Sequence, residues 1–285
     1  MQTVDPPQPS INFHFSILPR TITTLALATL LACSPGSFVD AAFSSRSPQR
    51  PAHKPNPPAA PKALPAPFRV GEKLTYRVSW ASFATAASAE LTIPERRDVY
   101  GWQTWHFRAS AHTASSVRTL FPIDDQFDSY SDVAGFDSRL YQDYLNEMGR
   151  KQDQQWRLVP EGQQKRVPGA AVIVLPGTRD PLGMLYSLRC VDWQHTPEIR
   201  VPVYDGRRLY EVRAKMDSPS ETVEVPAGKV SALRVAVHVF QHNAQVSGTD
   251  FMMWIAGDPA RTPVLMRAEL PFGSLRVELT SSLRF

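Results

Sequence analysis

The histidines come first in a search for chemistry, because imidazole binds metals and moves protons near neutral pH. His238 and His242 stand four residues apart, a spacing that on a helix would place two zinc ligands on one face. Val239 occupies the position of the glutamate in the H-E-x-x-H motif, however, and the sequence around the pair alternates as a strand. We therefore expect no metal site there. We also expect His106 and His112 to be ordinary surface or edge residues.

Four aspartates lie close together in the sequence: Asp124, Asp125, Asp128 and Asp132. Carboxylates can hold a hard cation, but the ligand spacing, central glycine and terminal glutamate of a calcium loop are absent. We predict a solvated acidic loop. The alternative that stays open is a hydrolase of unrecognised type, in which one of these carboxylates works with a histidine.

Motifs for nucleophilic and phosphoryl chemistry are missing from the sequence. Gly273-Ser274 and Gly248-Thr249 lack the frame of G-x-S-x-G, and no glycine-rich phosphate loop occurs. Cys190 has no disulfide partner inside the domain, so we predict a small buried side chain. The sequence assigns no catalytic residue, no metal ligand, no ligand-binding residue and no cofactor, which favours a role without catalysis.

The other cysteine, Cys33, follows a short apolar run over residues 21–32. This run is too short to cross a bilayer as a helix, but it fits the hydrophobic region of an export signal. Ala32 before Cys33 resembles a bacterial lipoprotein signal, in which the cysteine carries the lipid. Cleavage after Ala41 and an uncleaved anchor are the alternatives. All three export the chain to the periplasm or cell envelope, and a lipid on Cys33 would tether it to a membrane.

Composition divides the chain into a signal segment at 1–42, a linker at 43–67 and a single β-rich domain at 68–285. The linker is rich in proline and should be extended and solvated. Residues 1–66 carry five basic and two acidic side chains, whereas the remaining residues carry 26 and 25. The domain is therefore nearly balanced in charge, and we expect no nucleic-acid partner.

Apolar and polar residues alternate with period two along most of the domain, which predicts strands. The pattern is clearest over residues 249–283, and the Asp205-Gly206 pair predicts a tight hairpin turn. One segment departs from it. Asp180 before Pro181, followed by apolar residues spaced by three and four, predicts a short helix over residues 181–191. The other strands are predicted at residues 73–80, 84–93 (ending before a polar loop at Pro94), 102–110, 140–145, 154–159, 170–175, 199–204, 207–215, 222–225 and 230–240.

Several short segments, taken in their order and spacing, resemble the bacterial family numbered 3108 among domains of unknown function. They are Phe68-x-Val70-Gly71-Glu72-x-Leu74-x-Tyr76, Asp180-Pro181 with Leu185-Tyr186 and Arg189, Tyr204-Asp205-Gly206, Val225-Pro226-Ala227-Gly228-Lys229, Trp254-Ile255 with Asp258, and Pro263-Val264. The resemblance covers about residues 68–283. It departs at the Ala-rich stretch 84–89, where a glycine is expected. The resemblance implies an exported, β-rich envelope domain and supplies no catalytic residue.

The predicted fold is mostly β: one curved antiparallel sheet, or a partly open barrel or roll, with one short helix near 181–191. Such a sheet can hold a lipid or peptide on its concave face. Adaptable apolar side chains that could serve there are Met184, Met252, Met253, Trp254 and Met266. The first hypothesis is a membrane-tethered, non-catalytic envelope domain that binds an apolar ligand or an envelope protein. The alternative is a structural or assembly protein without a small ligand.

Overall fold

The computed structural model of the chain describes residues 65–163, 169–270 and 273–283. One sheet dominates these residues, with strand order β7-β6-β5-β4-β3-β2-β1-β14-β13-β12-β10-β9-β8 and β11 paired to β10. The strands are β1 (Lys73–Trp80), β2 (Phe83–Val99), β3 (Trp102–Thr113), β4 (Asp124–Asp132), β5 (Ser138–Glu147), β6 (Arg150–Pro160), β7 (Val172–Val174), β8 (Glu198–Tyr204), β9 (Leu209–Val225), β10 (Gly228–Gln241), β11 (Ala244–Gln245), β12 (Phe251–Ala256), β13 (Pro263–Leu270) and β14 (Gly273–Leu283).

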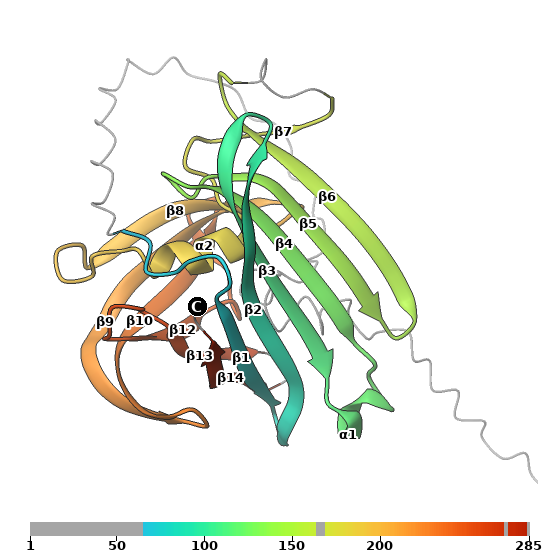
Figure 1. The fold of residues 1–285 in the computed structure, drawn as a ribbon, viewed down its shortest axis with the longest axis vertical. Coiled ribbons are helices and arrows are strands. Elements are labelled where there is room, and N and C mark those ends of the chain that lie inside the picture. Colours follow the sequence, from blue (N-terminus) through green and yellow to red (C-terminus); the bar gives the residue numbers. More distant parts are fainter. Residues whose placement is uncertain (1–64, 164–168, 271–272, 284–285) are drawn as a thin grey trace, which may run out of the picture.

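The sheet curls into an open barrel, with β1–β6 forming one wall and β8–β14 the other (Figure 1). Helix α2 (Pro181–Leu188) lies between the two walls at one end of the barrel. The predicted fold, a curved and partly open β structure with a short helix in this segment, is confirmed. The helix ends at Leu188 rather than at residue 191.

Cross-strand pairs identify which face of the sheet points inward. Tyr76 of β1 lies opposite Ala89 of β2 and Leu279 of β14, and all three are buried. Residues directly opposite each other share a face, so the apolar half of each alternating strand lines the interior. The side chains of α2 join the same hydrophobic core.

A short segment before α2 closes the barrel at the end where the helix lies. The N–H of Ser138 on β5 donates to the carbonyl of Thr178 (3.0 Å). The next residue, Arg179, exchanges backbone hydrogen bonds with Pro202 and Tyr204 of β8 (3.0 and 2.8 Å). Strand β5 of one wall and the edge strand β8 of the other are therefore joined through this segment.

The two walls also touch where the β8–β9 turn approaches β6. Gly206 has φ +94°, and a Cβ atom added there would lie 2.7 Å from the ring of Trp156. A side chain at position 206 would therefore collide with that ring, so the turn that the Asp205-Gly206 pair predicted needs glycine both for its conformation and for its contact.

Several sequence-based predictions about the elements are corrected. Strand β2 does not stop before Pro94 but continues to Val99, with a bulge between Thr92 and Glu95 that accommodates the missing N–H of proline. Residues 222–225 are part of the long strand β9. The β6–β7 pair is parallel. A second helix, α1 (Ser115–Arg118), connects β3 to β4.

The prediction of a solvated acidic loop is also corrected, because Asp124–Asp132 forms strand β4 between β3 and β5. Polar residues occupy both faces of this strand, so its alternation is not visible as a hydrophobic pattern.

The predicted signal segment 1–42, including Cys33, and the linker as far as residue 64 lie outside the described residues. Within the part of the chain that is described, no helix has the length and apolar character needed to cross a membrane.

Candidate functional site

Helix α2 is fixed to the wall formed by β4 and β5 through Asp180, its N-cap residue. The carboxylate accepts hydrogen bonds from the hydroxyls of Ser129 (2.6 Å) and Ser138 (2.5 Å) and from the N–H of Gly183 (2.8 Å). Asp180 is fully buried. The carboxylate thus caps the helix and satisfies two buried hydroxyls at once.

Close packing of α2 on β4 depends on Gly183. A Cβ atom at this position would lie 2.6 Å from the hydroxyl oxygen of Ser131 and 3.1 Å from that of Ser138. Both serines point inward from the wall, so the helix can approach only because this residue has no side chain.

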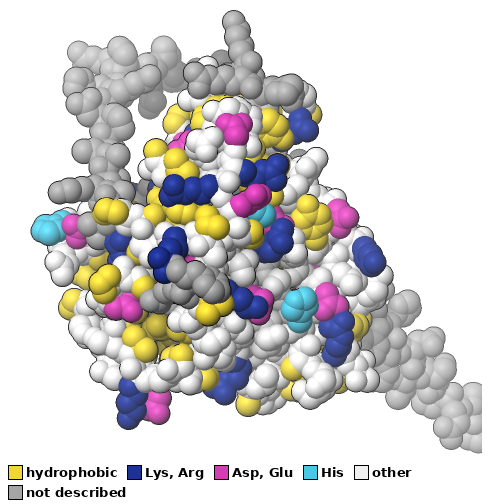
Figure 2. All heavy atoms as spheres, in the orientation of Figure 1, with side chains coloured by type: hydrophobic (Ala, Val, Ile, Leu, Met, Phe, Trp, Pro, Cys, Tyr) yellow, Lys and Arg dark blue, Asp and Glu magenta, His cyan; other side chains and the backbone are white. Residues whose placement is uncertain are grey.

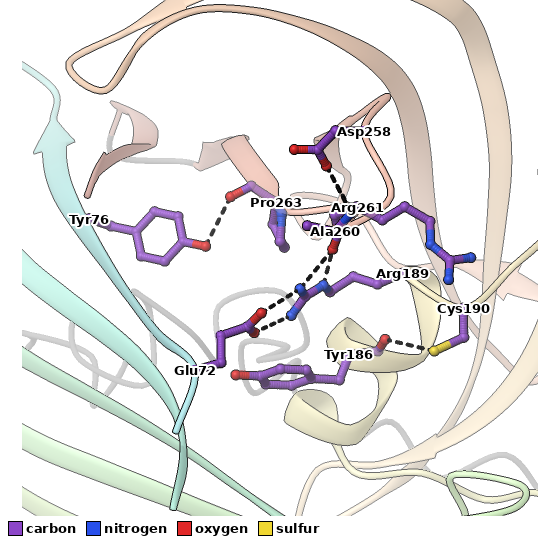
Figure 3. A network of polar contacts seen from close by, with 9 residues as sticks. All are labelled: Glu72, Tyr76, Tyr186, Arg189, Cys190, Asp258, Ala260, Arg261 and Pro263. Atoms are coloured by element: carbon purple, nitrogen blue, oxygen red, sulfur yellow. Dashed lines mark hydrogen bonds and ion pairs between the residues drawn. The ribbon is translucent and has the colours of Figure 1, made fainter. Parts of the chain in front are cut away.

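The end of α2 is fixed by a buried ion pair between Arg189 and Glu72 (Figure 3). The guanidinium donates to both carboxylate oxygens, at 2.6 and 3.0 Å. It also donates to the carbonyls of Ala260 and Arg261, each at 3.0 Å. The residue before β1, the end of α2 and the β12–β13 loop are therefore joined by one side chain.

Aromatic rings surround this ion pair and complete the packing at the helix end. The ring of Tyr186 stacks on Phe107 with centroids 3.9 Å apart, and Phe68 packs edge-on against both. Cys190 is buried, as predicted, and burial raises the pKa of its thiol to about 11. A thiol with this pKa is a weak nucleophile at neutral pH, so Cys190 is a packing residue.

Four of the six segments that carry the family resemblance come together here. Phe68, Glu72, Tyr76, Tyr186, Arg189, Asp258 and Pro263 all belong to this network. Tyr76 donates to the carbonyl of Pro263 (2.9 Å). These residues therefore build the fold around α2, and the carboxylate and guanidinium are already satisfied by one another.

The inner face away from α2 is less completely covered. Inward-facing apolar side chains remain half-buried there: Trp80, Leu145, Trp156, Met216 and Leu233. Gln154 lies opposite Asp143, so it also faces inward, yet it is exposed. The interior is thus open to solvent along β6.

Strand topology explains this opening. Strand β7 pairs only with Leu158, Val159 and Pro160 of β6. Residues 150–157 of β6 have a strand partner on the β5 side alone, within the part of the chain that the structure describes. The edge is rich in charged and amide side chains, which discourage pairing with another chain.

Two carboxyl groups interrupt the apolar inner face on β4 and β5. Asp125 lies opposite Ala111, and Asp143 lies opposite Phe127; both carboxyls are buried. Asp125 accepts one hydrogen bond, from the N–H of Asn146 (2.9 Å). Burial raises the pKa of Asp125 to about 7 and that of Asp143 to about 6.

On the outer face of the same wall, a histidine and an aspartate that the sequence analysis considered lie side by side. His106 Nε2 lies 2.5 Å from Asp128 Oδ1, and Arg108 and Gln126 donate to the same carboxylate. The ring of His106 stacks on Tyr130. His106 is buried, so its prediction as a surface residue is wrong: the rings and the ion pairs of neighbouring strands cover it.

This histidine–carboxylate pair lacks a nucleophile. In the described part of the chain, no serine, threonine or cysteine side chain hydrogen-bonds to His106, and its Nδ1 has no hydrogen-bond partner, with Glu95 at 3.6 Å. The hydrolase alternative gains a histidine beside an aspartate but no group for it to activate. The pair joins β3 and β4 through a buried hydrogen bond.

The remaining histidines lie apart from one another. His112 is exposed and contacts Asp124 (2.9 Å), which also binds Arg118. His238 lies on β10 beside Asp250 (2.9 Å), and His242 lies in the turn that follows. Among residues 65–163, 169–270 and 273–283, no group of three or more His, Cys, Asp or Glu side chains could hold a metal ion.

The candidate apolar ligand residues divide between the two faces of the sheet. Met253 of β12 and Met266 of β13 lie opposite each other on the inner face, and Met184 is buried on α2. Met252 is exposed on the outer face, and Trp254, also outward, donates to Glu221. Of these five side chains, only Met184, Met253 and Met266 can line the interior of the barrel.

Comparisons with known proteins agree with this picture. A family model described as "Protein of unknown function (DUF3108)" matches residues 75–280. No curated protein matches the chain. A crystal structure of a β-barrel-like protein of domain of unknown function DUF1849 from Brucella abortus has TM-score 0.50 and 12% identity, covering 76% of this chain and 99% of that chain. This likeness shows the fold.

Two weaker structural matches come from other bacteria. One is a candidate exported protein with a YmcC-like fold from Bacteroides fragilis, with TM-score 0.37, 10% identity and coverage of 78% of this chain and 100% of that chain. The other is a candidate lipoprotein from Parabacteroides distasonis, with TM-score 0.38, 10% identity and the same coverage.

Sequence reasoning missed the inward position of Asp125 and Asp143. A signal was present, because Asp125 lies two residues before Phe127 and therefore shares a strand face with it. It could be used only once residues 124–132 were known to form a strand.

Proposed function

Because the chain belongs to the DUF3108 family, whose members are described as proteins of unknown function, we propose a function from the site itself. The chain is an exported, non-catalytic envelope domain that binds an apolar or amphipathic ligand on the inner face of its open barrel. The ligand lies along β5 and β6, away from α2.

The half-buried state of the inward-facing apolar side chains carries this proposal. Leu145 and Trp156 face the interior beside the unpaired edge of β6 and keep part of their surface exposed. Covering such surface releases about 25 cal/mol per Å². An alkyl chain laid against these side chains therefore gains free energy from contacts that the fold leaves incomplete.

Binding of decanol, an uncharged amphiphile, tests the proposal. Titration calorimetry with the purified full-length chain should show saturable binding. Leu145→Asp should weaken it by about 10-fold or more, because a carboxylate replaces apolar contact surface at the site. Met252→Asp is the matched control, since Met252 is a partly exposed apolar residue on the outer face, and it should leave the affinity unchanged.

Two results would contradict the proposal. The first is the absence of saturable decanol binding to a folded chain. The second is an equal loss of affinity in Leu145→Asp and Met252→Asp, which would place the contact elsewhere. Either result would favour a structural or assembly role without a small ligand.

The proposal includes a tether to the membrane through a lipid on Cys33. Its support is the apolar run at residues 21–32 followed by the small Ala32. We expect the full-length chain to fractionate with membranes and Cys33→Ser to move to the soluble fraction. Cys190→Ser is the matched control, because this thiol is buried in the domain. A Cys33→Ser chain that stays with the membrane would rule out the lipid anchor.

A further inference from the structure

Three carboxyl groups form a row on the inner face where the barrel is open. Asp125 lies on β4, and Asp143 and Glu147 lie on β5. Asp143 opposes Phe127, two residues beyond Asp125, and Glu147 forms a bridge with Ile123, two residues before it. Each step along the row is therefore a diagonal cross-strand pair, with Cα atoms about 7–8 Å apart.

Each member of this row has a buried oxygen without a hydrogen-bond partner. The atoms are Oδ2 of Asp125, Oδ1 of Asp143 and Oε1 of Glu147. The side chains of Asp125 and Asp143 are buried, with only 1% and 8% of these residues exposed. Buried carboxylate oxygens normally have partners, so these atoms indicate a missing donor.

Among the described residues, no basic side chain forms an ion pair with this row. Arg150 lies opposite Glu147 across the β5–β6 hairpin, but the two form no ion pair, and Oε1 of Glu147 has no hydrogen-bond partner. The charge of Arg207 lowers the pKa of Asp143 without an ion pair between the two side chains. The wall therefore presents unpaired negative charge to an otherwise apolar interior.

The arrangement of the row favours one kind of cation. Among the described residues, no group of three or more His, Cys, Asp or Glu side chains could hold a metal ion. An ammonium group, in contrast, needs only hydrogen bonds to one or two carboxylates and can sit at the end of an alkyl chain.

We propose that the row Asp143–Asp125–Glu147 binds the protonated amine of an amphipathic ligand whose alkyl chain lies against Leu145 and Trp156. This inference rests on the proposed function, because it names the head group of the ligand that the interior would bind. Leu145 lies between Asp143 and Glu147 on the same strand and the same face, so the polar and apolar contacts adjoin.

The charge of the row depends on pH. Burial raises the pKa of Asp125, and the negative charges of Glu147, Asp124 and Asp143 raise it further. Burial also raises the pKa of Asp143, whereas a hydrogen bond from the backbone N–H of Gln154 and the charge of Arg207 lower it, and Asp153 raises it. With pKa values of about 7 and about 6, both aspartates are charged at pH 8 and mostly neutral at pH 5. An alkyl amine keeps its proton at both pH values. It should therefore bind more tightly than the alcohol of the same chain length at pH 8, and this difference in affinity should be lost at pH 5.

Calorimetric titration with decanol, decylamine and decanoate separates this inference from the proposed function, because the three probes share one chain. At pH 8 we expect decylamine to bind about 10-fold or more tightly than decanol, and decanoate to bind less tightly than either. The double variant Asp125→Asn with Asp143→Asn should bind decylamine no better than decanol. Asp153→Asn, which removes an exposed carboxylate from β6, should keep the preference.

The possible outcomes separate the proposed apolar site from the assignment of an amine to the carboxylate row. If decanol binds and decylamine binds no more tightly, the amine assignment is wrong and the apolar site stands. If neither binds to the folded chain, both are wrong. The asparagine substitutions preserve shape and remove buried charge, so the double variant should fold. If decylamine keeps its advantage in that variant, the row is not its binding site.

Discussion

Replacing Arg189 with methionine should destabilise the folded chain by about 3–5 kcal/mol, because it leaves the Glu72 carboxylate buried without a partner. Both side chains are almost inaccessible, at 0% and 1% exposure. The carbonyls of Ala260 and Arg261 lose their donors as well. Urea unfolding followed by tryptophan fluorescence measures the change as a lower midpoint at unchanged slope.

A double variant distinguishes a lost ion pair from lost packing. Arg189→Met combined with Glu72→Met removes both charges and should recover much of the loss, since a buried ion pair and an apolar pair are often of similar stability. Arg200→Met is the control, because Arg200 pairs with Glu198, both side chains are exposed, and its loss should cost less than about 1 kcal/mol. If Arg189→Met costs no more than Arg200→Met, the network around α2 does not support the fold.

Replacing Asp180 with alanine should cost about 3–4 kcal/mol. The loss combines an N-cap, worth about 1 kcal/mol, with two buried hydroxyls that lose their carboxylate acceptor, at about 1–3 kcal/mol each before relaxation. The hydroxyls belong to Ser129 and Ser138. Helix α2 should lose its attachment to the wall, and thermal unfolding of the variant measures the loss.

Asp98→Ala is the matched control for this prediction. Asp98 also accepts a backbone hydrogen bond, from Gly101 (2.9 Å), but it is exposed at the end of β2, beside the turn to β3. Its loss should cost less than about 1 kcal/mol. Comparable effects of the two substitutions would mean that the buried position of Asp180 adds nothing to the stability of α2.

The sequence predicts the strands wherever one face is apolar and the other polar. Strand β1 is the clearest case, because Leu74, Tyr76 and Val78 alternate with polar residues and are all buried. Helix α2 was predictable from Asp180 and Pro181, since capping is a local interaction. Local rules thus predict the elements and the fold class.

The contacts of the site could not be predicted in the same way, because they depend on how distant strands align. Glu72 and Arg189 are 117 residues apart, and only the tertiary fold brings them together. Strand β4 was missed because its inward residues include Asp125, Ser129 and Ser131, which hide the period of two. The inward position of Asp125 then follows from the register with β3, which the sequence does not reveal.

Photolabelling with a decanol analogue that carries a diazirine at the end of its alkyl chain tests most directly whether the interior of the barrel holds the ligand. After irradiation of the full-length chain, peptide mapping by mass spectrometry should find the label on inward-facing residues of β5 and β6, such as Leu145 and Trp156. Excess decanol should abolish that labelling. Label confined to exposed apolar residues of the outer surface, such as Met252 or Leu120, or insensitive to excess decanol, would contradict binding inside the barrel.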